Sequence, residues 1–372
     1  MKVVRLDIGR LAIPFHAPFR HAAAERSETD SVWVEARSRS DAIGHGEACP
    51  RAYVTGEDRR SVAAFFARHR DELMARISEL GDLIDWSAAH RCEIDRNPAA
   101  WCAIELALLD LLAAERGDSV EALLDLPELG GGFRYSAVVG ADDGATFRRT
   151  VDRYRVFGFT DFKLKLSGDL SRDRDNLAWF QQHAPPDVRV RFDANNLWPT
   201  VAAAARYLDG VRCPAFAVEE PLHAYQYEAL AELAATSGAR IILDESCVRV
   251  EHVEALADLG TDWIINVRVS KMGGIVRSLG VVQTARRHGI PVIVGAQVGE
   301  TSLLTRAALT IASAARDLLI AQEGAFGTLL LTTDVCEPSL MFGPGGALTV
   351  PAPSAPGFGL AVTEELSTLA AL

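Results

Sequence analysis

The sequence predicts an α/β protein: a TIM-type (β/α)8 barrel preceded by a smaller α+β domain. Beyond a glycine run at residues 130–132, eight short apolar runs alternate with stretches of helical periodicity. Such alternation implies a parallel sheet, and eight strand–helix units within roughly 200 to 250 residues match the size of a barrel. At 372 residues the chain also exceeds what one ordinary core fills.

The α+β domain is expected over residues 1–128. Residues 31–36 (SVWVEA) alternate apolar and polar side chains, and Gly44, Gly46 and Pro50 punctuate the pattern, as in a small antiparallel sheet. From about 58 to 116 the apolar spacing becomes helical, which indicates a group of helices after the sheet.

The barrel is expected over residues 129–342. Its strands are predicted at 135–139, 162–166, 188–192, 215–218, 240–243, 263–267, 291–294 and 317–320. An open doubly wound sheet is the alternative, but its usual GxGxxG motif is missing from residues 140–144 (GADDG). The segment 343–372 is irregular, with many Gly and Pro residues, and is expected to pack on the N-terminal domain.

Composition narrows the class of partner. A formal charge of −12 without a dense Lys/Arg block argues against nucleic acid and favours a small polar substrate. No stretch is long and apolar enough for a membrane span, and the N-terminus does not have the pattern of a signal peptide, so we expect a cytoplasmic protein. Six scattered cysteines without a CxxC pair suit reduced thiols.

Three carboxylates follow consecutive predicted strands. Asp193, Glu219 and Asp244 each end an apolar run, and they lie 26 and 25 residues apart, about the length of one strand–helix unit. In a barrel they would meet at the C-terminal rim, where oxygen donors suit Mg²⁺. The alternative is that each merely caps a helix. Glu220 and Glu245, beside them, should point the other way and support the ligands.

Two lysines occupy the strand before these carboxylates. In residues 162–166 (FKLKL) the strand period of two places Lys163 and Lys165 on one face. On a surface strand this would be a solvated face; in a barrel, whose outer face is apolar, both lysines point inward. Crowded ammonium groups near a divalent ion disfavour each other's protonation, which would lower a lysine pKa toward that of a useful base.

The sixth predicted strand carries an arginine at its rim. Arg268 is effectively always protonated, so it can stabilise negative charge but cannot act as a base. Lys271 lies off the strand by this count, where a structural or helix-start role is favoured.

These motifs resemble the enolase superfamily, in particular the muconate lactonizing enzyme subgroup of the mandelate racemase/muconate lactonizing enzyme family. The resemblance rests on KLK (163–165), DANNLW (193–198), EEP (219–221), DES (244–246) and the lysine-glycine segment that ends at Gly274. Residues 46–57 are also similar to the capping loop of dipeptide epimerases, so the resemblance covers nearly the whole chain.

The resemblance implies a capping domain over the barrel mouth and a Mg²⁺-dependent isomerase, often a homo-oligomer, that enolises a small carboxylate. Lys165 would take the α-proton with Lys163 as its partner, and Asp193, Glu219 and Asp244 would bind the metal, with Asn195 close to it.

One departure from the subgroup bears on the reaction. The subgroup usually has a lysine where this chain has Arg268, and epimerisation by two bases needs a proton donor on each face of the substrate. A one-base outcome, such as syn-elimination of water by a lyase or cycloisomerisation, therefore stands beside epimerisation or racemisation.

Substrate contacts are expected from the capping loops and the late strands. The candidates are His21, Arg51 and Tyr53 in the former, and Gln297, Glu300 and Glu323 in the latter. A packed or ion-paired role is the alternative for His21 and Arg51, whereas Glu323 could bind an ammonium group or act as an acid.

Two other hypotheses remain open at the level of sequence. One is a non-catalytic binding protein, with Arg268 as the sign of lost activity; the intact lysines and carboxylates speak against it. The other is an unrelated metal-dependent aldolase-type barrel, which would not need the KLK strand.

Overall fold

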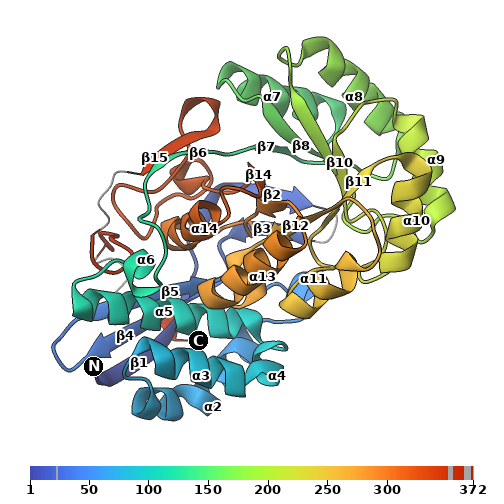
Figure 1. Cartoon of the computed structure of the whole chain (residues 1–372). Coiled ribbons are helices and arrows are strands. Elements are labelled where there is room, and N and C mark those ends of the chain that lie inside the picture. Colours follow the sequence, from blue (N-terminus) through green and yellow to red (C-terminus); the bar gives the residue numbers. More distant parts are fainter. Residues whose placement is uncertain (22–23, 351–354, 364–369, 372) are drawn as a thin grey trace.

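The computed structural model describes residues 1–21, 24–350, 355–363 and 370–371. The N-terminal third of the chain forms an α+β domain (Figure 1). Its main sheet is antiparallel in the order β16-β1-β4-β5. The strands are β1 (Val3–Leu11), β4 (Ser31–Ser38), β5 (Ile43–Ala48) and the C-terminal β16 (Ala370–Ala371). A separate hairpin pairs β2 (Pro14–His21) with β3 (Ala24–Glu28).

Six helices complete this domain in the described residues: α1 (Ala52–Thr55), α2 (Arg59–Arg76), α3 (Leu80–Ala89), α4 (Arg91–Ile94), α5 (Pro98–Arg116) and α6 (Val120–Leu123). The apolar α5 is the central one and lies directly on β5. Two glycines of β5 permit this approach, since a Cβ on Gly44 or Gly46 would come within 2.2 Å of a backbone oxygen of α5. The expected sheet and helix group are therefore both present.

The barrel sheet contains eight parallel strands in chain order. They are β7 (Ala137–Val139), β8 (Asp161–Lys165), β9 (Arg189–Asp193), β10 (Ala217–Glu219), β11 (Arg240–Leu243), β12 (Trp263–Val267), β13 (Val292–Val294) and β14 (Leu319–Gln322). Between the two end strands, Ser136 N donates a hydrogen bond to Gln322 O at 2.8 Å. The predicted barrel is confirmed.

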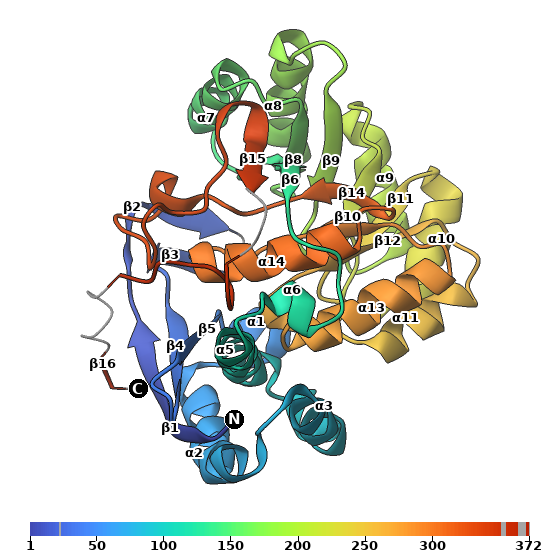
Figure 2. The same cartoon turned by 60° about the vertical axis from the view of Figure 1, so that its left-hand side comes forward.

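Helices cover the outside of this sheet (Figures 1 and 2). They are α7 (Gly144–Val156), α8 (Leu170–His183), α9 (Val201–Val211), α10 (Tyr227–Ser237), α11 (Val250–Ala257), α12 (Val269–Met272), α13 (Ile275–Arg287) and α14 (Ser302–Ala314). Two of these helices, α12 and α13, follow β12, and after β14 the described chain forms a 3-10 turn, Gly327–Leu329, instead of a helix. That segment meets the N-terminal hairpin, where His16 N donates to Leu330 O at 2.9 Å.

The C-terminal segment touches both parts of the molecule. β15 (Ala347–Val350) pairs with β6 (Gly131–Arg134), which leads into the barrel, and β16 pairs with β1. Between them, Phe358 N donates to Asp110 Oδ1 on α5 at 2.7 Å. The boundaries expected at residues 128 and 342 remain predictions.

No helix in the described ranges is both long and apolar enough to span a membrane. All six cysteines are free thiols.

A buried ion pair joins the two domains. Arg306 on α14 donates from Nη1 and Nη2 to the two carboxylate oxygens of Glu121 on α6, each at 2.8 Å, and Thr310 Oγ1 donates to Glu121 at 2.6 Å. Arg306 Nε also donates to the carbonyl of Phe358 at 2.9 Å. Burial acts to raise the pKa of Glu121, but Arg306 and Thr310 outweigh it, and the pKa lies below its usual range.

Removing this carboxylate should destabilise the fold, because Arg306 would stay buried without its partner. Glu121→Gln is expected to lower the free energy of unfolding by about 3–5 kcal/mol, measured by urea denaturation. Glu128→Gln, an exposed carboxylate nearby in the chain, is the control. A Glu121→Gln protein as stable as this control would contradict the role of the pair.

Candidate active site

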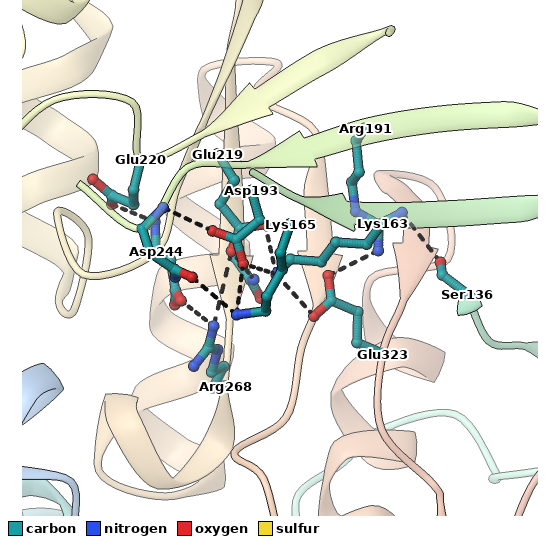
Figure 3. Close-up of polar contacts among 12 residues, drawn as sticks. Ser136, Lys163, Lys165, Arg191, Asp193, Glu219, Glu220, Asp244, Arg268 and Glu323 are labelled. Carbon is teal, nitrogen blue, oxygen red and sulfur yellow. Dashed lines mark hydrogen bonds and ion pairs between the residues drawn. The ribbon is translucent and has the colours of Figure 1, made fainter. Parts of the chain in front are cut away.

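Strand β8 brings both predicted lysines to the inside of the barrel (Figure 3). Lys163 is 2% exposed, and its Nζ lies 2.8 Å from Glu219 Oε2, 3.1 Å from Asp193 Oδ2 and 3.2 Å from Glu323 Oε2. Lys165 is 13% exposed; its Nζ lies 3.2 Å from Asp193 Oδ2 and donates to Asn195 Oδ1 at 3.0 Å. The structure thus places the two lysines beside the carboxylates, as the strand period predicts.

The three expected ligands converge from neighbouring strands. Asp193 ends β9, Glu219 ends β10 and Asp244 follows β11, and all three are buried. Oδ2 of Asp193 and Oε2 of Glu219 accept no hydrogen bond from any described residue and contact only charged groups in ion pairs. Arg268 and Lys271 contact Asp244. The site therefore gathers buried carboxylate oxygens whose charge is balanced by lysine and arginine side chains.

The pKa of Lys163 shifts in the direction opposite to the one expected. Burial acts to lower its pKa, but Asp193, Glu219 and Glu323 outweigh burial and raise it above the usual lysine value. The crowding of two ammonium groups does not lower the pKa of Lys163 here, because three carboxylates surround it. Conversely, burial and the neighbouring carboxylates raise the pKa of Glu219 to about 7.

Glu220 and Glu245 behave differently from each other. Glu220 accepts hydrogen bonds from Asp244 N at 2.6 Å and Ser246 N at 2.8 Å, which fixes the turn that carries Asp244. Glu245 instead lines the cavity beside Arg268, so the expectation that it points away is wrong. The reason is that β11 ends at Leu243, and Asp244 and Glu245 lie in a turn where side chains do not alternate.

Two residues on β12 and just beyond it hold the ligands in place. Asn266 Nδ2 donates to Glu219 Oε1 at 3.0 Å. Lys271 is buried and donates to Asp244 Oδ1 at 2.9 Å and to the carbonyls of Asp244 and Asn266. Lys271 has the structural role that the sequence favours. Asn266 was missed, although it lies two residues before Arg268 on the same strand face.

Arg268 enters the site from the end of β12. Its guanidinium contacts Asp244, lies 3.8 Å from Glu219 Oε1 and donates to Gln297 Oε1 at 3.1 Å. Burial acts to lower its pKa, but the carboxylates of Asp244 and Glu245 raise it beyond the usual arginine value. Arg268 is therefore a fixed cation.

Arg191 extends the ion-pair network around Lys163, because both side chains pair with Glu323. Arg191, on the same face of β9 as Asp193, donates to Glu323 Oε1 at 2.8 Å and to Asp161 Oδ1 at 2.6 Å. Lys163 and Arg191 hold the pKa of Glu323 well below its usual range in spite of burial, so this carboxyl is ionised. These contacts disfavour the expected roles of Glu323 as an acid or a free ammonium partner. The R-x-D spacing of residues 191–193 was the signal for Arg191.

A cavity of about 680 Å³ opens over this site. Lys163, Lys165 and Arg268 line its inner end, with the three buried carboxylates behind them. Of the expected substrate contacts, Tyr53, Gln297, Glu300 and Glu323 line the cavity. Its outer wall is largely apolar and includes Tyr154, Phe157, Phe326, Leu329, Leu330 and Phe342.

Two expected substrate contacts are not found at the cavity. Arg51 is buried and donates to the backbone carbonyls of Thr29, Asp30, Pro50 and Val298 at 2.7–3.1 Å. Its fixed charge therefore anchors the capping loop, and the prediction that it binds substrate is not supported. The side chain of His21 lies outside the described part of the chain.

Comparison with known proteins identifies the family. Residues 146–366, more than half of the chain, match the family described as "Enolase C-terminal domain-like". The chain belongs to this family. The predicted resemblance to the enolase superfamily is thereby confirmed.

Relatives of this enolase-family chain include isomerases. It is 26% identical over 368 residues to L-Ala-D/L-Glu epimerase from Bacillus subtilis (strain 168), with 97% of each chain covered. Two solved structures share its fold at 22% identity. One is a dipeptide epimerase from Cytophaga hutchinsonii in complex with Mg and D-Ala-L-Val (TM-score 0.85, 99% and 98% covered). The other is 2-chloromuconate cycloisomerase from Rhodococcus opacus 1CP (TM-score 0.86, 100% of both covered). Family and relatives together support an isomerase of the enolase superfamily.

Proposed function

We propose that this protein is a Mg²⁺-dependent enzyme that removes the proton next to the carboxylate of a small substrate, with Lys165 as the base. The observation that carries the proposal is the position of Lys165, which lines the cavity and lies 3.2 Å from Asp193, one of the three buried carboxylates that meet behind it. Proton removal beside a carboxylate requires that the developing dianion be neutralised as it forms, so a base and a concentration of positive charge must act together.

The residues present suit a divalent cation. Oδ2 of Asp193 and Oε2 of Glu219 are buried acceptors without a hydrogen bond from the described residues, and Asp244 lies beside them. Such a set of hard oxygen donors fits Mg²⁺. When bound by Asp193, Glu219 and Asp244, Mg²⁺ would supply the positive charge that neutralises the substrate carboxylate and the enediolate.

The chain's own cations divide the remaining work. Lys165, held by Asn195, presents its amine to the cavity and takes the proton. Lys163 is enclosed by carboxylates and sets the charge around Asp193 and Glu219. Arg268 stabilises negative charge on the substrate, but cannot release a proton to it because its pKa is too high.

This division favours a reaction with one base: cycloisomerisation, or syn-elimination by a lyase. The proton then leaves and returns, or is lost with a leaving group, on the face that Lys165 serves. Epimerisation is the second candidate, favoured by the similarity to L-Ala-D/L-Glu epimerase. It would need a second proton donor on the opposite face.

The cavity supports a carboxylate substrate with an apolar extension. Lys165 and Arg268 line it and can contact a carboxylate, and its wall also carries Tyr154, Phe157 and Phe342. Amino-acid derivatives whose nitrogen is acylated, including dipeptides, combine these features. In these compounds the nitrogen beside the carboxylate-bearing carbon is acylated and uncharged, so it needs no pairing with Glu323, which Arg191 and Lys163 already occupy.

Proton NMR in D2O with Mg²⁺ tests the proposal. The protein is incubated with pooled dipeptides, N-acyl amino acids, hydroxyprolines and sugar acids. Loss of one α-proton signal would establish enolisation, and the product formed would separate exchange, epimerisation and elimination. Failure to exchange any member of the panel, together with no Mg²⁺ binding by calorimetry, would favour the non-catalytic binding protein.

Replacing Arg268 by lysine tests the one-base reaction. For an exchanging substrate with two enantiomers, the wild type is expected to exchange only one, whereas Arg268→Lys should also exchange the other, because a lysine can donate and accept a proton. Each enantiomer is followed separately by NMR, with the exposed Arg287→Lys as control. A wild-type protein that exchanges both enantiomers at comparable rates would replace the one-base proposal with epimerisation.

A further inference from the structure

A cluster of histidines and carboxylates lies in the capping domain, away from the barrel cavity. His69 and Glu72 belong to α2, and His90 is the C-cap of α3. In Figure 1 α5 lies between these helices and the barrel. One donor atom from each of the three residues lies within 4.8 Å of the other two. Nothing in the proposed reaction uses them.

The local sequence brings the three side chains together. His69 and Glu72 are three residues apart in a helix and so project from the same face. The chain then turns and returns as α3, whose end carries His90. Glu72 Oε2 lies 3.8 Å from His90 Nε2. The other carboxylate oxygen of Glu72, Oε1, accepts a hydrogen bond from Arg76 at 2.9 Å. One carboxylate oxygen is thus directed at the histidine.

The orientation of the His90 ring is the informative feature. Its Nδ1 lies 2.9 Å from the carbonyl of Trp86, and only a protonated nitrogen can bond to a carbonyl. In the neutral ring the lone pair is then on Nε2, which faces the Glu72 carboxylate. Two acceptors facing each other repel unless a cation lies between them or Nε2 itself takes up a proton. Metal-binding histidines characteristically donate the other ring N–H to a carbonyl in this way.

Aromatic packing holds the ligand rings in place. Trp86 stacks on His90 with centroids 3.9 Å apart and an interplanar angle of 14°, and it also stacks on Trp101. His69 is buried and packs against the edge of Trp86, with centroids 5.2 Å apart. The two imidazoles therefore lose little further freedom on binding an ion, which favours affinity.

A second carboxylate adjoins the cluster. Oε2 of Glu93 lies 3.1 Å from His69 Nε2 and 3.3 Å from Arg68 Nη1. It can orient His69 or supply a fourth ligand. Glu72 and Glu93 thus both present carboxylate oxygens to the histidines, and a metal requires its carboxylate ligand in the ionised form.

We propose that His69, Glu72 and His90 form a second metal site, for a divalent transition ion of the zinc class, that ties α2 to the end of α3. Two imidazoles and a carboxylate suit Zn²⁺, Co²⁺ or Ni²⁺, whereas the all-oxygen set in the barrel suits Mg²⁺. Bond lengths of about 2.0–2.2 Å require the donors to draw together, a modest movement for the half-exposed Glu72. His90 and Glu72 reach the surface, so an ion can enter from solvent.

The test compares two matched variants with Mg²⁺ in excess, so that the barrel site is the same in both. Glu72→Gln removes a ligand with almost no change of shape, and Asp71→Asn alters the adjacent, exposed carboxylate of the same helix. Zn²⁺ is titrated by calorimetry, and Co²⁺ by its visible absorption. The expected result is one Zn²⁺ per chain in Asp71→Asn that binds at least about tenfold more weakly in Glu72→Gln.

Three outcomes would overturn the proposal. Equal Zn²⁺ affinity in Glu72→Gln and Asp71→Asn would exclude Glu72 as a ligand. Loss of binding in Cys92→Ser would assign the ion to the exposed thiol next to the cluster instead. If neither variant binds Zn²⁺, the cluster is an ion pair between Glu72 and a histidine, and the proposed metal site is refuted.

Discussion

The Lys165→Ala variant should exchange the α-proton of the substrate about 10²- to 10⁴-fold more slowly than the wild type, the range typical for removal of a general base. Lys165 is the partly exposed member of the lysine pair and lines the cavity, whereas Lys163 is enclosed by Asp193, Glu219 and Glu323. Lys163 also belongs to β8 and lines the cavity, but the carboxylates around it raise its pKa, so it cannot replace Lys165 as the base. The rate is measured by NMR in D2O on the substrate identified from the panel.

A measurement of Mg²⁺ affinity shows whether Lys165→Ala is slow because the base is missing or because the metal site is damaged. Mg²⁺ binding by Lys165→Ala should persist, since Asp193, Glu219 and Asp244 are unchanged, and Lys2→Ala serves as a control for a lysine far along the chain. A Lys165→Ala protein that exchanges the α-proton at more than a tenth of the wild-type rate would refute the assignment of Lys165 as base.

Glu219→Gln is expected to weaken Mg²⁺ binding and to lower the exchange rate by at least about 10²-fold, because a bound ion contributes several kcal/mol of charge stabilisation. The substitution keeps the shape of the side chain, and Asn266 can still donate to its oxygen. It removes, however, the anionic oxygen that is directed at Lys163 and at the centre of the carboxylate group. Calorimetry with Mg²⁺ and NMR exchange report the two effects separately.

The exposed Glu228→Gln on α10 is the matched control for that substitution. It should leave both metal affinity and exchange unchanged. If Glu219→Gln binds Mg²⁺ as tightly as Glu228→Gln does, Glu219 is not a metal ligand, and the ion-pair network around Lys163 would have to explain its burial.

Local periodicity in the sequence was sufficient to predict the positions of the residues at the centre of the site. A strand period of two places Lys163 and Lys165 on one face, and the length of one strand–helix unit brings Asp193, Glu219 and Asp244 to one rim. Both are properties of regular structure, and so they can be read from spacing alone. The same period of two also indicates that Arg191 and Asn266 face the site, because they lie two residues before Asp193 and Arg268, respectively.

Where regular structure ends, spacing loses its meaning. Beyond Leu243 the chain turns, so Glu245 faces the cavity although alternation predicts the opposite. Glu220 has a positive φ of 40°, and its carboxylate turns to the backbone of Asp244. A turn sets each side-chain direction separately, through hydrogen bonds that the sequence does not display.

The sequence by itself determined the fold class, the barrel strands and the meeting of the lysines with the three carboxylates, because each follows from short-range periodicity. Only the tertiary structure decided the partners of the remaining charges. Arg51 anchors a loop through carbonyls as distant as that of Val298, and Glu323 pairs with Arg191 from a strand far away in the chain. A buried charge is bound by whichever opposite charge or dipole the fold brings within 3 Å or so, and that neighbour is set by packing between elements rather than by position along the chain.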